Sequence, residues 1–98
     1  MTSKDESIIH VLEALDLPRR GWQVVDHWDA DAHAIGIARR SDLRRLVYVS
    51  TFGRHDGRYD YECESPIGPN EVDYVATDRA QNVTFDQLLA ALDRHLCG

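Results

Sequence analysis

The strongest constraint on the fold is the middle of the chain, where four strand-like runs follow one another with only short polar turns between them. The runs begin at Trp22, His33, Arg44 and Arg58. In the last run, Tyr and Cys residues alternate with Asp and Glu, a two-residue period typical of a strand with one buried face. Turns this short cannot hold a crossover helix, so the runs predict an antiparallel meander.

An amphipathic helix is predicted before the strands. Apolar residues recur at helical spacing from Ile8 to Leu15, after an S-x-x-E capping motif at residues 3–6. Pro18 disfavours a helical conformation at Leu17. The pattern therefore predicts a helix over residues 4–16.

A second helix is predicted at the C-terminal end. Thr84 and Gln87 form another capping motif, and leucines follow on one helical face as far as Leu96. A short fifth strand is predicted at residues 71–77. The expected fold class is α+β: an antiparallel meander of four to five strands flanked by an N-terminal and a C-terminal helix, in one domain spanning residues 1–98.

Turn positions predict how the strands pair. A first loop at residues 29–32 places Trp22 opposite Arg39 and Val24 opposite Ile37, and the next turns place Ile35 opposite Tyr48 and Tyr48 opposite Cys63. One face then carries most of the large residues: Trp22, Val24, Ile35, Ile37, Leu46, Tyr48, Phe52, Tyr59, Tyr61 and Cys63. The other face carries Ala34, Gly36 and Ala38 together with three valines and the acidic residues of the last run.

We expect the helices to cover the large aromatic face, because large apolar side chains are usually buried in a domain's core. The alternative places the helices on the small-residue face and leaves an exposed aromatic interaction surface, for which the candidates are Trp22, Trp28, Tyr48, Tyr59 and Tyr61. In the first case Val25, Val47 and Val49 remain as an apolar strip on the far face. That strip and the exposed sheet edge predict a homodimer.

The segment DHWDADAH at residues 26–33 resembles a metal site in composition. Its candidate ligands are His27, His33, Asp29 and Asp31. The predicted register points the two histidines to opposite faces, and aspartates are common turn residues, so a polar hairpin tip is expected and no metal or cofactor is predicted. A metal- or ligand-binding protein or hydrolase using these residues is the alternative.

Most of the basic residues gather at one end of the predicted sheet. These candidate anion- or partner-binding residues are Arg19, Arg20, Arg39, Arg40, Arg44 and Arg45. They predict either a site for a phosphate, a nucleic-acid backbone or an acidic loop, or a solvated turn whose arginines pair with Glu62, Glu64 or Glu71. Solvated charge runs are the commoner case.

Composition narrows the function classes. The net charge of −6 argues against general nucleic-acid binding, and no apolar run is long enough to span a membrane. A cytoplasmic protein with two reduced cysteines is expected, and no catalytic motif is found, since Cys63 occupies a core position. The sequence therefore predicts a small acidic, non-enzymatic module with a protein partner, comparable as a class with immunity proteins and secretion chaperones.

Overall fold

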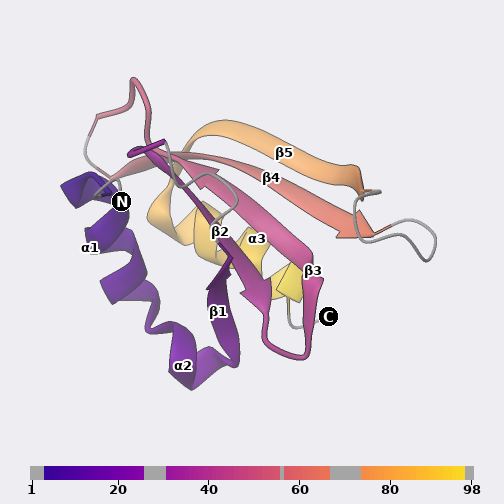
Figure 1. The fold of residues 1–98 in the computed structure, drawn as a ribbon. Helices are drawn as coiled ribbons and strands as arrows, with labels where there is room; N and C mark the ends of the chain where they lie inside the picture. The colour runs from indigo at the N-terminus through magenta and orange to yellow at the C-terminus, as the bar shows by residue number, and fades with distance from the viewer. Residues whose placement is uncertain (1–3, 26–30, 56, 67–73, 97–98) are drawn as a thin grey trace.

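The computed structural model describes residues 4–25, 31–55, 57–66 and 74–96 (Figure 1). Five strands form one antiparallel sheet in the order β1-β2-β3-β4-β5. The predicted α+β meander between two helices is thus confirmed, with one further short helix. The elements are α1 (Glu6–Leu15), α2 (Leu17–Arg20), β1 (Trp22–Val25), β2 (Ala34–Arg39), β3 (Asp42–Ser50), β4 (Arg58–Pro66), β5 (Tyr74–Thr84) and α3 (Phe85–Leu96).

Helix α1 begins two residues later than predicted, because a different residue caps it. Asp5 has an extended backbone, and its side chain accepts a hydrogen bond from the Ser7 N–H at 3.1 Å. Aspartate is a favoured residue at this position. The predicted capping residue, Ser3, lies outside the described residues.

The first helix ends before Leu17, as Pro18 predicts, but the expectation that Leu17 itself is not helical is wrong. Leu17 opens α2, and Pro18 sits in its first turn, where the missing N–H is not needed. The chain leaves α1 through Asp16, at φ 51°, and leaves α2 through Gly21, at φ 76°. At the other end of the chain the predicted capping box of α3 is confirmed, since Thr84 and Gln87 exchange hydrogen bonds of 2.8 and 3.2 Å.

The predicted pairing of β1 with β2 is confirmed, and the pairing of β2 with β3 is wrong by one residue. Trp22 lies opposite Arg39, but Ile35 lies opposite Val49 rather than Tyr48. Between β3 and β4, Tyr48 likewise lies opposite Glu62 rather than Cys63. The cause of the β2–β3 shift is a bulge: Arg39 pairs with Asp42 across the turn, while the preceding residue pairs with Leu46. A shift of one residue exchanges the two faces of a strand.

The one-residue shift of β3 changes which of its side chains belong to the core. Val47 and Val49 are fully buried against the helices, so the predicted spare valine strip is wrong. Trp22, Tyr59 and Tyr61 are 1, 8 and 8% exposed in the same core. The helices therefore cover the aromatic face, as predicted. Side chains of α1, α2 and α3 join the sheet in this one core: Ile8, Val11, Leu15, Leu17, Leu88, Ala91, Leu92 and Leu96.

The opposite face of the sheet carries Tyr48, which the shifted register moves away from the core. Tyr48 is half-buried there, opposite Gly36 of β2 and Glu62 of β4. Ala34 and Leu46 are buried but do not belong to the core between sheet and helices. Of the predicted aromatic surface, Trp28 lies outside the described residues.

Strand β5 is longer than the predicted 71–77 and forms one edge of the sheet. It continues to Thr84 through the polar run DRAQN, which shows no two-residue alternation. Its pairing with β4 is interrupted twice by bulges, and Asn82 adopts φ 55°. Bulges twist an edge away from other strands. The homodimer stays a prediction, and this edge is poorly suited to provide it.

No helix in the described part of the chain is long and apolar enough to cross a membrane.

Candidate functional site

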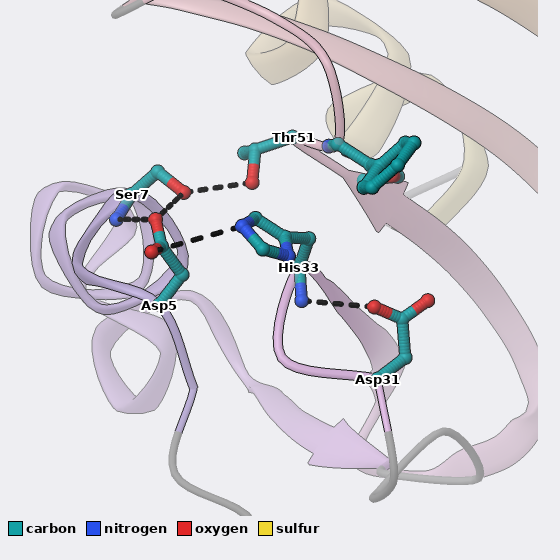
Figure 2. Close-up of polar contacts among 7 residues, drawn as sticks. Asp5, Ser7, Asp31, His33 and Thr51 are labelled. Carbon is teal, nitrogen blue, oxygen red and sulfur yellow. Dashed lines mark hydrogen bonds and ion pairs between the residues drawn. The ribbon is translucent and has the colours of Figure 1, made fainter.

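The first turn of α1, the segment before β2 and the end of β3 meet at one corner of the molecule (Figure 2). We call this the N-terminal corner and define it by Asp5, Ser7, His33, Thr51 and Phe52. Backbone hydrogen bonds hold the three segments together: Asp5 N–H donates to Ala32 O at 2.7 Å, and Thr51 N–H donates to His33 O at 2.9 Å. Backbone hydrogen bonds alone therefore connect the three segments of the corner.

A chain of hydroxyl groups links α1 to β3 at this corner. Ser7 Oγ lies 2.6 Å from Asp5 Oδ2 and 2.7 Å from Thr51 Oγ1. An ionised carboxylate only accepts hydrogen bonds, so Ser7 donates to Asp5 and Thr51 donates to Ser7. Thr51 is 6% exposed, and this bond satisfies its buried hydroxyl.

The Asp5 carboxyl is held in its ionised form. The hydrogen bonds from the Ser7 hydroxyl and the Ser7 N–H lower the pKa of Asp5 below its ordinary value, and the nearby imidazole of His33 adds to the effect. His33 Nε2 lies 3.7 Å from Asp5 Oδ1. A carboxylate with a lowered pKa is a weak base, and the Ser7 proton points to it rather than to His33. This arrangement clamps a helix terminus and does not activate a nucleophile.

Phe52 stands out from the same corner into solvent. Its side chain is 72% exposed. The ring meets His33 edge-on, with ring centroids 5.8 Å apart and planes at 78°. The Phe52 N–H donates to Ser50 Oγ at 3.2 Å. These contacts orient the aromatic ring in spite of its exposure.

A pocket of about 360 Å³ lies between α1 and the loop that joins β3 to β4. Hydroxyl, acidic, imidazole and guanidinium groups line it, among them Glu6, His10, His55 and Arg58. Arg54 also lines the pocket, but its guanidinium is engaged by the Asp60 carboxylate at 2.9 and 3.3 Å. Arg58 donates one hydrogen bond to a backbone carbonyl of β5, at 3.2 Å.

Two of the four predicted metal ligands can be placed. The Asp31 carboxylate accepts a hydrogen bond from the backbone N–H of His33 at 2.9 Å, while the His33 ring faces Asp5. His27 and Asp29 lie outside the described residues. Within residues 4–25, 31–55, 57–66 and 74–96, no three His, Cys, Asp or Glu side chains form a group that could hold a metal ion.

The predicted arginine cluster lies where both long helices end. Arg20 Nε donates to the carbonyl of Leu15, the last residue of α1, and Arg39 Nε donates to that of Leu96, the last residue of α3, at 2.6 Å. Helix C-termini carry partial negative charge, which these guanidinium groups offset. Other contacts of the cluster include ion pairs of 3.8 Å from Arg19 to Asp16 and from Arg44 to Asp42, and a 2.9 Å bond from the Arg40 N–H to Gly21 O.

Arg45 differs from the other arginines of this cluster. Its Nε is buried and has no hydrogen-bond partner among the described residues. A predicted acidic partner of the cluster, Glu71, lies outside those residues. Anion binding at the arginine cluster therefore stays a prediction, and at least two of its guanidinium groups are already used by the fold.

Cys63 is confirmed as a core residue. It is 2% exposed, and burial raises the pKa of its thiol to about 11, with the Asp78 carboxylate adding to the rise. Nucleophilic chemistry needs the thiolate, which is scarce at neutral pH in such a site. Cys63 thus supplies packing and no reactive group.

Comparisons with protein-family models, with curated proteins and with solved structures find no match to this chain. Its function must be inferred from its own residues.

The sequence did not predict the contact between Ser7 and Thr51. The two residues are 44 positions apart, and a hydroxyl side chain gives no periodic signal. The sequence signal that was available is local: an Asp two residues before a Ser at the start of an apolar helical pattern is a capping arrangement. Even so, that signal would have located the cap without the strand it contacts.

Proposed function

We propose that this protein is a non-enzymatic protein-interaction module that binds its partner through the N-terminal corner. The observation that carries the proposal is the presentation of Phe52. The other exposed large hydrophobic residues of the described chain are between 40 and 44% exposed, against 72% for Phe52: Ile9, Val24, Leu43 and Val75.

Exposure of an aromatic ring to water is unfavourable in free energy, and a bound partner that covers the ring removes this cost. Phe52 is held by its contact with His33 and by its backbone bond to Ser50, so little conformational freedom remains to be lost on binding. Aromatic side chains next to a concave surface are typical energetic centres of protein interfaces. The pocket of about 360 Å³ shares Thr51 with the same loop and supplies that concave surface.

The polar groups at the corner support binding more than catalysis. The Ser7 and Thr51 hydroxyls are already engaged in the hydrogen bonds that lead to Asp5. The thiol of Cys63 is buried on another part of the sheet. Such satisfied groups rigidify a surface without providing an activated nucleophile.

The test is quantitative capture of partners from an extract of the cells that produce the protein. Wild type, Phe52→Ala and a matched control, Leu43→Ala, are compared; Leu43 is a 44% exposed residue near the turn at the other end of β3. Truncating an interface centre costs about 2 kcal/mol or more, roughly thirtyfold in affinity. We expect a protein retained by wild type and Leu43→Ala and lost from Phe52→Ala. Equal retention by all three proteins would refute the proposal.

A further inference from the structure

We propose that the protein partner bound at the N-terminal corner is basic, and that it places a lysine or arginine side chain in the pocket of this corner, against the carboxylate of Glu6. The inference rests on the proposed function and deepens it, because it gives the chemistry of the partner that covers Phe52.

The first support is the sign of the charge at the corner. The described segments that form it are residues 4–13, 31–33, 51–55 and 57–60. They carry five carboxylates and three basic side chains: Asp5, Glu6, Glu13, Asp31 and Asp60, with Lys4, Arg54 and Arg58. The sequence adds a further aspartate at position 56 of the same loop. With histidine neutral the corner is therefore acidic, and it attracts a basic group.

The second support is the opposite charge at the other end of the sheet. The arginine cluster lies where β3 begins, and the N-terminal corner lies where β3 ends. The segments that carry the cluster, residues 16–22 and 39–45, hold six arginines and only two carboxylates. A basic partner is thus attracted to one end of the molecule and repelled by the other. Complementary charge of this kind orients a partner as it approaches, here towards Phe52.

The third support is an acceptor in the pocket that the fold does not use. Glu6 lies in the first turn of α1, is exposed and lines the pocket. Among the described residues its carboxylate has no hydrogen-bond or ion-pair partner. The neighbouring Asp5 receives both bonds from Ser7 on Oδ2, so its Oδ1 keeps acceptor capacity. The pocket wall therefore offers two carboxylates to an ammonium or guanidinium group.

The groups that would repel a cation here are offset. The Arg54 guanidinium is bound to the Asp60 carboxylate at 2.9 and 3.3 Å. Arg58 donates to the Asn82 carbonyl of β5 at 3.2 Å. The positive end of α1 faces the corner, but the capping carboxylate of Asp5 and the first-turn carboxylate of Glu6 outweigh its partial charge.

The test is an NMR titration of the full chain at pH 7.5 with two blocked dipeptides, acetyl-Leu-Arg-amide and acetyl-Leu-Gln-amide. The peptides share an apolar side chain that can cover Phe52 and differ in the charge of the second residue. We expect the arginine peptide to shift the Glu6, Ser7 and Phe52 amides saturably and to bind about threefold more tightly, the effect of one exposed ion pair. Glu6→Gln should remove this difference. The matched control, Glu13→Gln, makes the same change on the same helix outside the pocket lining and should keep it.

Any of three results would overturn the inference: no saturable shift with the arginine peptide, equal affinity of the two peptides for wild type, or equal losses in the two glutamate variants. Arg58→Gln gives a check of opposite sign. Removal of this cation from the lining should tighten binding of the arginine peptide and leave the glutamine peptide unchanged. Weaker binding of the arginine peptide to Arg58→Gln would contradict a cation site.

A second arm separates failure of this inference from failure of the proposed function. Capture of partners from the cell extract is repeated with Glu6→Lys, with Glu13→Lys as the control and Phe52→Ala for comparison. We expect the retained protein to be lost from Glu6→Lys and from Phe52→Ala and kept by Glu13→Lys. Loss from Phe52→Ala alone would overturn the basic partner and leave the Phe52 surface standing, whereas retention by every variant would overturn both.

Discussion

Replacing Ser7 by alanine tests the hydroxyl chain that fastens α1 to β3. The substitution removes both the 2.6 Å bond to Asp5 and the 2.7 Å bond to Thr51. It leaves the Thr51 hydroxyl, in a residue only 6% exposed, without this partner. The alanine itself fits a helix at least as well as serine does.

The magnitude follows from the two bonds. A buried hydroxyl left without a partner costs about 1–3 kcal/mol, while the bond to the exposed Asp5 carboxylate is weakened by water. We expect Ser7→Ala to lower the free energy of unfolding by about 2 kcal/mol in total. Thr51→Val keeps the side-chain volume and the Ser7–Asp5 bond, so its cost should be about 1 kcal/mol.

The double variant distinguishes this account from a general loss of helix stability. Ser7→Ala/Thr51→Val leaves no orphaned hydroxyl, so it should be little less stable than Ser7→Ala alone, with a coupling energy of about 1 kcal/mol. Urea unfolding followed by circular dichroism measures all three variants, with Ser41→Ala in an exposed turn as the control. Additive losses, or a Ser7→Ala loss no larger than that of Ser41→Ala, would refute the reasoning.

Three further predictions follow from other contacts. Arg39→Met should lower the free energy of unfolding by at least about 1 kcal/mol, because it removes the hydrogen bond to the C-terminal carbonyl of α3. The control, Arg40→Met in the neighbouring turn, should change the free energy of unfolding by less than about 0.5 kcal/mol. Equal losses of the two variants in denaturant titrations would exclude the capping role of Arg39. Folding lowers the pKa of Asp5 below 3.8, so the ionised carboxylate stabilises the folded state above that pH and this stabilisation is lost below it. Asp5→Asn should therefore have a lower free energy of unfolding than wild type at pH 6. If the difference between the two proteins does not narrow towards pH 2 in parallel unfolding curves, the prediction is contradicted. In a Cys97→Ser background, the Cys63 thiol, with its pKa raised to about 11, should react with iodoacetamide far more slowly at pH 8 in the native protein than in urea, a difference that mass spectrometry would show and that equal rates would disprove.

The order of elements was predictable because it depends on local patterns. Alternation in the strands, a capping box at Thr84 and short polar turns each act within a few residues, and together they predicted the meander and α3. The pairing of β1 with β2 was also predictable, since the apolar residues of both strands fit one face in only one register.

The parts that failed depend on a bulge or on solvent-exposed chain. The residues between Asp42 and Leu46 bulge out of the β2–β3 pairing, and no turn-counting argument detects this, so Tyr48 and Val47 were placed on the wrong faces. The predicted fifth strand ended too early because the polar run DRAQN, at the edge of the sheet, shows no alternation of apolar and polar residues. The candidate site depends on Ser7 meeting Thr51, which only the tertiary fold determines.

The central claim is that the partner surface of this chain is the N-terminal corner around Phe52. A photoreactive phenylalanine analogue placed at position 52 in living cells tests it most directly, with the same analogue at Leu43 as the control for an exposed apolar site at the opposite end of β3. We expect a discrete cross-linked protein from position 52 and none from position 43. A cross-link from position 43 alone, or no cross-link from position 52, would contradict it.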